Sequence, residues 1–153
     1  RHMLQQGDKA PGFKATDQNG NTIQLEDYKG QKVALYFYPK DNTPGCTAQA
    51  CNLRDNTEAL TSRGIAVIGV SVDDEKSHKK FEDKFQLNFP LVADTDQKIV
   101  NDYQVWGLKK FMGKEYMGTS RTTFLVNEQG IIEHIITKVD TKDHARQILD
   151  TWQ

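Results

Sequence analysis

The chain has 153 residues, of which 37% are hydrophobic, and this length is typical of one domain with a buried core. Its 20 basic and 21 acidic residues nearly cancel, and no basic stripe indicates binding to nucleic acid or to an anionic membrane. The apolar runs are too short to span a membrane and the N-terminus has no signal-peptide core, so we expect a cytoplasmic protein. Residues 1–2 precede a methionine and are interpreted as a cloning remnant, which leaves residues 3–153 as a single domain.

The order of the predicted elements indicates the fold class. Continuous apolar runs predict buried strands, and amphipathic segments between them predict helices. In chain order, the expected strands cover residues 13–16, 22–25, 33–38, 65–72, 89–92, 122–126 and 131–137. The expected helices cover residues 43–63, 73–85, 96–103 and 141–152, and the glycine-containing segment 105–120 is expected to be a loop or an irregular hairpin. This order predicts an α/β fold with a mixed central sheet flanked by helices and an N-terminal hairpin.

The strongest chemical signal lies where the strand 33–38 gives way to a helix. Pro39 ends the strand, because proline cannot donate a hydrogen bond to a ladder. Thr43 is a favoured N-cap residue and Pro44 suits the first helical position, so Cys46 is expected in the first turn of the helix. The unpaired N–H groups and the dipole at a helix N-terminus favour a thiolate, which is the nucleophilic form of cysteine. The Thr43 hydroxyl is placed one turn before the sulfur, where it could orient a small oxygen-containing substrate.

The second cysteine, Cys51, follows five positions later on the same predicted helix. Five helical residues rise about 7.5 Å and place the two Cα atoms roughly 8–9 Å apart, with diverging Cβ atoms. A disulfide needs Cα atoms within about 7 Å. The two cysteines therefore cannot pair while the helix is intact, but they can pair if its first turns unwind. This spacing is expected of a reacting pair, in which one sulfur attacks and the other resolves.

These residues carry a resemblance to a known family. The pattern Pro39-x-x-x-Thr43-x-x-Cys46 resembles the active-site motif of the peroxiredoxins. The longer run from Tyr38 to Asp55 resembles the bacterioferritin comigratory protein or PrxQ branch, an atypical two-cysteine type with the same five-residue spacing. The resemblance extends to Arg121-Thr122-Thr123-Phe124-Leu125 and covers nearly all of the chain. Gln49 is a departure, because this branch often has glutamate there.

The resemblance implies a thioredoxin-like fold and a peroxidase that needs no metal, haem or flavin. Cys46 would attack hydrogen peroxide or an organic hydroperoxide and become sulfenic acid, and Cys51 would resolve it as an intramolecular disulfide. Thioredoxin or a similar dithiol protein would then reduce the disulfide. Arg121 would stabilise the thiolate and the charge on the leaving oxygen, and the ring of Pro39 would shield the sulfur from water. On the same basis we expect a monomer.

Other interpretations of these residues remain open. The main alternative is a thiol–disulfide oxidoreductase of the thioredoxin type, although such a protein normally has Cys-x-x-Cys and a proline before the strand that begins at Thr122. A non-enzymatic domain with a buried structural Cys46 and an inert Cys51 is the second alternative. Without the resemblance, Arg121 would be interpreted as a solvated loop arginine.

Several further residues are assigned no catalytic role. A zinc site would need two ligands besides the cysteines, and the histidines are scattered along the sequence. These histidines are His2, His78, His134 and His144. His134 alternates with Ile132 and Ile136 and is expected at the surface or partly buried, whereas Trp106 and Tyr116 are expected to pack within a loop.

Overall fold

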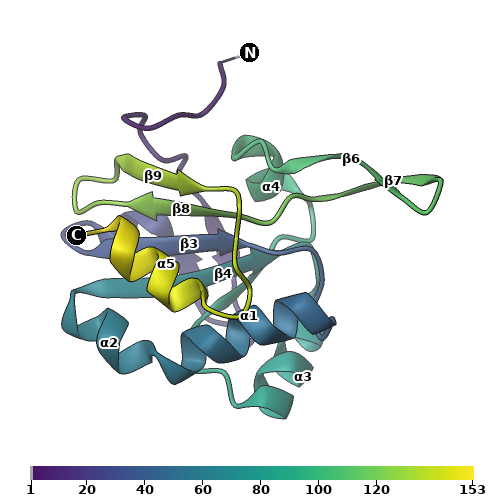
Figure 1. The fold of residues 1–153 in the computed structure, drawn as a ribbon, viewed down its shortest axis with the longest axis horizontal. Helices are drawn as coiled ribbons and strands as arrows, with labels where there is room; N and C mark the ends of the chain where they lie inside the picture. Colours follow the sequence, from purple (N-terminus) through teal and green to yellow (C-terminus); the bar gives the residue numbers. More distant parts are fainter. Residues whose placement is uncertain (1) are drawn as a thin grey trace.

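The computed structural model describes residues 2–153, and a five-stranded mixed sheet forms its centre (Figure 1). The strand order is β5-β4-β3-β8-β9, in which β3, β4 and β5 are parallel while β8 and β9 are antiparallel to their neighbours. These strands are β3 (Lys32–Phe37), β4 (Ile65–Ser71), β5 (Leu91–Ala93), β8 (Thr122–Val126) and β9 (Ile132–Ile136). The predicted α/β class with a mixed sheet is confirmed.

Helices and a small hairpin cover the two faces of this sheet. Along β3, Ala34 and Tyr36 point into a core under α1, α2, α3 and α5, whereas Val33, Leu35 and Phe37 point into a second core under β1, β2, η1 and α4. The helices are η1 (Leu25–Tyr28), α1 (Pro44–Asp55), α2 (Thr57–Ser62), α3 (Glu75–Phe85), α4 (Lys98–Asp102) and α5 (His144–Thr151). The N-terminal hairpin pairs β1 (Lys14–Thr16) with β2 (Thr22–Gln24), as predicted. Among residues 2–153, no helix has the length and apolar character needed to cross a membrane.

The helix predicted for residues 43–63 is wrong in one respect, because it is divided at Asn56. The backbone of Asn56 has φ −111° and ψ 17°, and this residue ends α1 and precedes α2. Its side-chain amide donates to the carbonyl of Asn52 at 2.8 Å, and the Thr57 hydroxyl donates to the carbonyl of Arg54 at 2.9 Å. Side chains that bond to nearby carbonyls compete with the helical pattern, and this competition accounts for the break.

The segment 105–120, expected to be a loop or an irregular hairpin, is a regular hairpin. β6 (Trp106–Phe111) pairs with β7 (Lys114–Thr119) in a separate two-stranded sheet that projects from the body of the protein (Figure 1). Met112 and Gly113 join the strands with φ values of 51° and 80°, the two positive values that a type I′ turn requires. Trp106 packs partly buried against the second core. Tyr116 is 49% exposed on β7, so the prediction that it packs within a loop is wrong.

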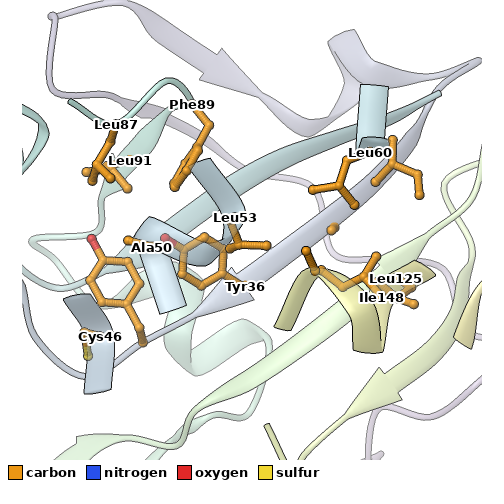
Figure 2. Close-up of a cluster of buried hydrophobic side chains, with 14 of the residues drawn as sticks. Tyr36, Cys46, Ala50, Leu53, Leu60, Leu87, Phe89, Leu91, Leu125 and Ile148 are labelled. Carbon is orange, nitrogen blue, oxygen red and sulfur yellow. The ribbon is translucent and has the colours of Figure 1, made fainter. Parts of the chain in front are cut away.

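The core under α1 places Cys46 at one end of a continuous buried cluster (Figure 2). Cys46, Ala50 and Leu53 lie on the buried face of α1, and Leu60 continues this face on α2, as their spacing predicts. The ring of Tyr36 lies in the same cluster and stacks on Tyr38 with ring centroids 5.4 Å apart. The floor of the site is therefore made of large, tightly packed side chains.

Gly69 on β4 makes room for this floor, and we predict that Gly69→Ala destabilises the fold. An added Cβ would lie 3.0 Å from the Tyr36 ring and 3.0 Å from Leu91 Cδ2. Overpacking of this kind costs about 1–3 kcal/mol, which chemical denaturation would measure. Gly107→Ala is the matched control, because nothing lies within 4 Å of its added Cβ, and its effect should stay within about 0.5 kcal/mol. Equal stability of the two variants would contradict the packing argument.

Candidate active site

Cys46 is a buried thiol in the first turn of α1. Its exposed fraction is 2%, and Pro44 and Gly45 precede it in the same turn. Cys51 lies on the same helix, is only half-buried and faces away from the core that holds Cys46. Both thiols are free. One continuous helix through the two cysteines agrees with the predicted separation of the pair.

The loop before α1 is closed by the side chain of Thr43. Thr43 occupies the N-cap position, but its hydroxyl donates to the carbonyl of Lys40 at 2.9 Å rather than accepting from an N–H group of the helix. The prediction that Thr43 caps the helix is therefore correct in position and wrong in bonding. The reason is local: Asn42 has φ 58°, which folds the chain back so that the Thr43 hydroxyl reaches Lys40. Pro39 is half-buried at the start of this loop, directly beyond β3 and Tyr38.

Arg121 is brought to Cys46 by the sheet. The antiparallel pairing of β3 with β8 sets Phe37 opposite Thr122, so the residue before β8 lies beside the loop that follows β3. Arg121 Nη1 donates to Cys46 Sγ at 3.4 Å across 75 positions of sequence, and the same nitrogen donates to Gln49 Oε1 at 2.8 Å. The guanidinium also lies over the helix start, because a Cβ built on Gly45 would be 3.2 Å from Arg121 Nη2. Arg121 is thus fixed at the sulfur and is not a solvated loop residue.

The neighbours of this contact are buried and uncharged. Gln49 is fully buried, and its amide nitrogen has no hydrogen-bond partner among residues 2–153. Burial raises the pKa of Tyr36 well above its usual range, and the nearby Cys46 adds to this effect, so the phenol stays neutral. Arg121 forms no ion pair with the residues that the structure describes, because a neutral glutamine stands at position 49. The positive charge is therefore directed at the sulfur without a carboxylate to offset it.

This arrangement is suited to nucleophilic chemistry at sulfur. A fixed guanidinium and the N-terminal end of a helix both favour the thiolate of Cys46. The same guanidinium has further N–H groups that could bind an oxygen atom on which negative charge develops. The site can therefore attack a small electrophile and stabilise an oxygen leaving group in the same place.

Comparison with known proteins identifies the family. The family model described as AhpC/TSA matches residues 6–135. The chain belongs to the AhpC/TSA family. Among relatives of this AhpC/TSA chain, the peroxiredoxin Bcp of Bacillus subtilis (strain 168) is 45% identical over 145 residues, which are 95% of this chain and 92% of that protein. The peroxiredoxin Bcp of Escherichia coli (strain K12) is 44% identical over 147 residues, which are 96% and 94% of the two chains.

Solved structures agree with this family assignment. A serine variant of PrxQ from Xylella fastidiosa superimposes with a TM-score of 0.91 at 30% identity, covering 99% of this chain and 96% of that one. A peroxiredoxin Q variant from Xanthomonas campestris superimposes with a TM-score of 0.85 at 32% identity, covering 91% and 88%. The AhpC/TSA chain therefore has the thioredoxin-like peroxiredoxin fold that its cysteine motif predicts.

The sequence alone does not indicate that two histidines of this AhpC/TSA protein are buried near the site. His144 is fully buried at the start of α5, where its Nε2 and the Thr123 hydroxyl are 2.8 Å apart. Burial lowers the pKa of His144, and the charge of Arg121 acts in the same direction, so the ring is neutral. His78 is also fully buried, and it contacts Asp41 in the loop before α1. The spacing of His78, Phe81 and Phe85 on one face of α3 is the signal that could have indicated a buried histidine.

Gly45 is required for the approach of Arg121, so we predict that Gly45→Ala weakens the activation of Cys46. The added Cβ would push the guanidinium from the sulfur, because the two groups would be 3.2 Å apart. Loss of about 1.4 kcal/mol of thiolate stabilisation would slow alkylation of Cys46 by iodoacetamide about 10-fold in a Cys51→Ser background. The free energy of unfolding should not fall, because alanine is the better helix former.

The matched control for this variant is Thr47→Ala. Thr47 lies in the same turn of α1, and the substitution also raises helix propensity, but Thr47 has no contact with the guanidinium among the hydrogen bonds of the described residues. Alkylation of the control should match that of the parent protein. Equally fast alkylation of Gly45→Ala would show that the close approach of Arg121 does not set the reactivity of Cys46.

Proposed function

We propose that the protein is a thiol-dependent peroxidase that reduces hydrogen peroxide and organic hydroperoxides at Cys46. The observation that carries this proposal is the 3.4 Å contact between Arg121 Nη1 and Cys46 Sγ in the first turn of α1. The peroxiredoxin Bcp relatives support it, since they match this chain over 95–96% of its length. The reaction uses protein side chains, with no metal, haem or flavin.

The first step is attack on the peroxide. The Cys46 thiolate attacks the terminal oxygen of the hydroperoxide and forms an S–O bond with it, the O–O bond breaks, and the other oxygen leaves and takes a proton to become water or an alcohol. Cys46 becomes sulfenic acid. Arg121 stabilises the thiolate before the reaction and the charge on the leaving oxygen during it. Thr43 and Pro39 belong to the loop before α1, and in this proposal the Thr43 hydroxyl orients the peroxide while the proline ring limits access of water to the sulfur.

The second step is resolution by Cys51. The Cys51 thiolate attacks the sulfur of the sulfenic acid, hydroxide leaves as water after protonation, and an intramolecular disulfide forms. Both cysteines lie within α1 (Pro44–Asp55), where the helix holds their Cα atoms roughly 8–9 Å apart. Disulfide formation therefore requires the first turns of α1 to unwind.

The cycle is completed by a dithiol reductant. One thiolate of a dithiol protein such as thioredoxin attacks the disulfide and forms a mixed disulfide. The second thiol of that protein then breaks the mixed disulfide, so the reductant leaves as a disulfide and both Cys46 and Cys51 are reduced. The half-buried position of Cys51 supports access of such a partner. Action as a monomer, expected from the family resemblance, and location in the cytoplasm, expected from the sequence, both stay predictions.

Turnover assays distinguish this function from that of a thiol–disulfide oxidoreductase. The protein should consume hydroperoxide in the presence of a thioredoxin system and lose this activity in Cys46→Ser. It should not reduce a protein disulfide at a comparable rate. Faster turnover with the disulfide substrate than with the hydroperoxide would reject the proposal.

Arg121→Ala should slow the peroxide step about 100-fold or more, because it removes a few kcal/mol of charge stabilisation. Single-turnover oxidation of a Cys51→Ser protein by hydrogen peroxide isolates this step. Arg121→Lys keeps the charge but has no planar group that can donate hydrogen bonds to Cys46 and Gln49 together. Its peroxide step should therefore be slower than that of the parent protein and faster than that of Arg121→Ala. A rate in Arg121→Ala within about 3-fold of the parent would remove Arg121 from the mechanism.

Oxidation with one equivalent of peroxide should reduce the helix content and speed amide exchange across residues 43–52. The reason is that the disulfide cannot form on an intact helix, so a local order–disorder change must accompany it. Circular dichroism and hydrogen exchange of both redox states measure the change. In Cys51→Ser the helix should stay intact, with Cys46 open to further oxidation. Identical protection in the two redox states would indicate that Cys46 pairs with a thiol of another molecule instead.

A further inference from the structure

A buried carboxylate lies inside the loop that leads to Cys46. Asp41 is 7% exposed, between Pro39 and Thr43. Its Oδ1 accepts from the Tyr38 hydroxyl at 2.6 Å, and its Oδ2 accepts from the Ser77 hydroxyl at 2.8 Å and lies 2.6 Å from His78 Nδ1. Tyr38, the residue directly after β3, and two side chains of α3 thus converge on one residue of the active-site loop.

The partner histidine must carry two protons. His78 is fully buried, with Nδ1 facing the Asp41 carboxylate and Nε2 lying 3.0 Å from the Val92 carbonyl oxygen. Both of these groups are acceptors only, so both ring nitrogens donate and the ring is an imidazolium. Burial alone would lower the pKa of His78, but the hydrogen bond and charge of Asp41 and the Val92 carbonyl outweigh it and raise the pKa. Asp41 and His78 therefore form a buried ion pair.

A proton rather than a metal ion holds this cluster together. Asp41, Asp73 and His78 present atoms within 4.8 Å of one another that could ligate a cation. Every such atom of Asp41 and His78 already has a hydrogen-bond partner of the opposite kind. Asp73 Oδ2 likewise accepts from the Asp41 backbone N–H at 2.9 Å and from the Ser71 hydroxyl at 2.7 Å. The network is complete without a metal.

The network fixes the loop at the residue that precedes its turn. Asp41 is held through its side chain by Tyr38, Ser77 and His78, and through its backbone by Asp73. The chain then turns at Asn42, and Thr43 closes the loop on Lys40 before α1 begins. The loop that leads into the first turn of α1, where Cys46 lies, is therefore fixed at a residue that is tied to α3 and to the chain just after β4.

We propose that the Asp41–His78 ion pair is a positioning pair for the peroxide step, which holds the loop from Pro39 to Thr43 in its reactive geometry. The same pair marks the fixed upstream end of the segment that unwinds for resolution. This inference rests on the proposed peroxidase function. Loss of the pair should slow attack on the peroxide, which needs the ordered loop, and should not slow disulfide formation, which needs the loop and helix start to open.

A pH dependence follows from the charge on His78. Its pKa in the folded protein is raised above the unfolded value of about 6.5, so the ion pair is fully present below that pH and is lost as the pH rises through the folded pKa. The titratable groups that face His78 are Asp41, Asp73 and Tyr38 from the packed elements and Glu75 on its own helix. The peroxide step should therefore slow at alkaline pH, even though alkaline conditions alone do not remove a thiolate nucleophile.

The test separates the two chemical steps in matched variants. Asp41→Asn keeps the shape of the side chain, and His78→Asn keeps a donor near the position of Nδ1, but each removes one charge. The peroxide step is measured by single-turnover oxidation in a Cys51→Ser background, from about pH 6 to about pH 10. Resolution is measured in the two-cysteine protein by quenching the reaction and alkylating the remaining thiols. Each single variant leaves one buried charge without its partner, which can prevent folding, whereas the double variant Asp41→Asn/His78→Asn leaves none. If a single variant does not fold, the rates of both steps are measured in the double variant.

We expect the peroxide step to slow about 10-fold or more in each single variant and no further in the double variant, because the two residues act as a unit. The alkaline decrease should disappear in His78→Asn, and resolution should be as fast as in the parent or faster. Asp17→Asn is the control for stability alone, since Asp17 is a buried carboxylate that accepts from two backbone N–H groups in the β1–β2 turn. It should leave both steps and the pH profile unchanged.

Three results would overturn the inference. The first is an unchanged peroxide rate in the variants, and the second is an alkaline decrease that persists in His78→Asn. The third is inhibition of the parent protein by added Zn²⁺ that Asp41→Asn abolishes, because the cluster would then be a metal site. Each of these requires a parent protein whose Cys46 reacts with peroxide. A parent that does not react would instead reject the proposed function itself.

Discussion

The contact between the Arg121 guanidinium and the Cys46 sulfur is the interaction on which the site depends. It joins a helix start to a residue 75 positions later, and only the pairing of β3 with β8 brings the two together. The side chains packed beneath this contact all help to hold the start of α1 at the edge of the sheet. Gly69 admits the Tyr36 ring, the ring supports the buried face of α1, and Gly45 lets the guanidinium approach the first turn. The chemistry at sulfur is thus a property of the whole sheet.

The helix α1 has to satisfy two opposing requirements in the proposed cycle. Attack on the peroxide needs an ordered first turn, with its N–H groups and dipole aimed at the sulfur. Resolution needs the same turn to melt, because the helix keeps Cys46 and Cys51 apart. The buried residues of α1 are distributed to suit both requirements: Ala50 and Leu53 anchor its second half in the core, whereas Thr47 and Cys51 on the outer side are only half-buried. A helix that was equally well packed along its whole length would favour the first step at the expense of the second.

Local sequence signals predict the parts of the site that are local in structure. Thr43, Pro44 and the apolar spacing after them place Cys46 at a helix start because caps and periodicity act within one turn. They do not show that the Thr43 hydroxyl bonds to Lys40, since that depends on the positive φ of Asn42. Arg121 is ambiguous without the family motif, because its neighbour in space is decided by strand order. His78 is the clearest omission: a histidine on the apolar face of a helix gives no indication of its partner, and the Asp41 carboxylate is supplied by a loop 37 positions away.

Asp41 fixes the upstream end of the segment that must unwind for resolution. A segment that melts from a free end loses order progressively, and the loss spreads until packing stops it. Here both ends are fixed: Asp41 is tied to α3 by a buried ion pair, and Leu53 is fully buried on the core-facing side of α1. The chain between them contains Cys46 and Cys51, together with the polar residues Thr47 and Gln49. Because fixed ends limit the conformations of the melted segment, they lower the entropy of its open state and so oppose the opening. The Asp41 anchor therefore orders the loop for the peroxide step and confines the opening to the chain between Asp41 and Leu53, while its loss would ease the opening that resolution needs.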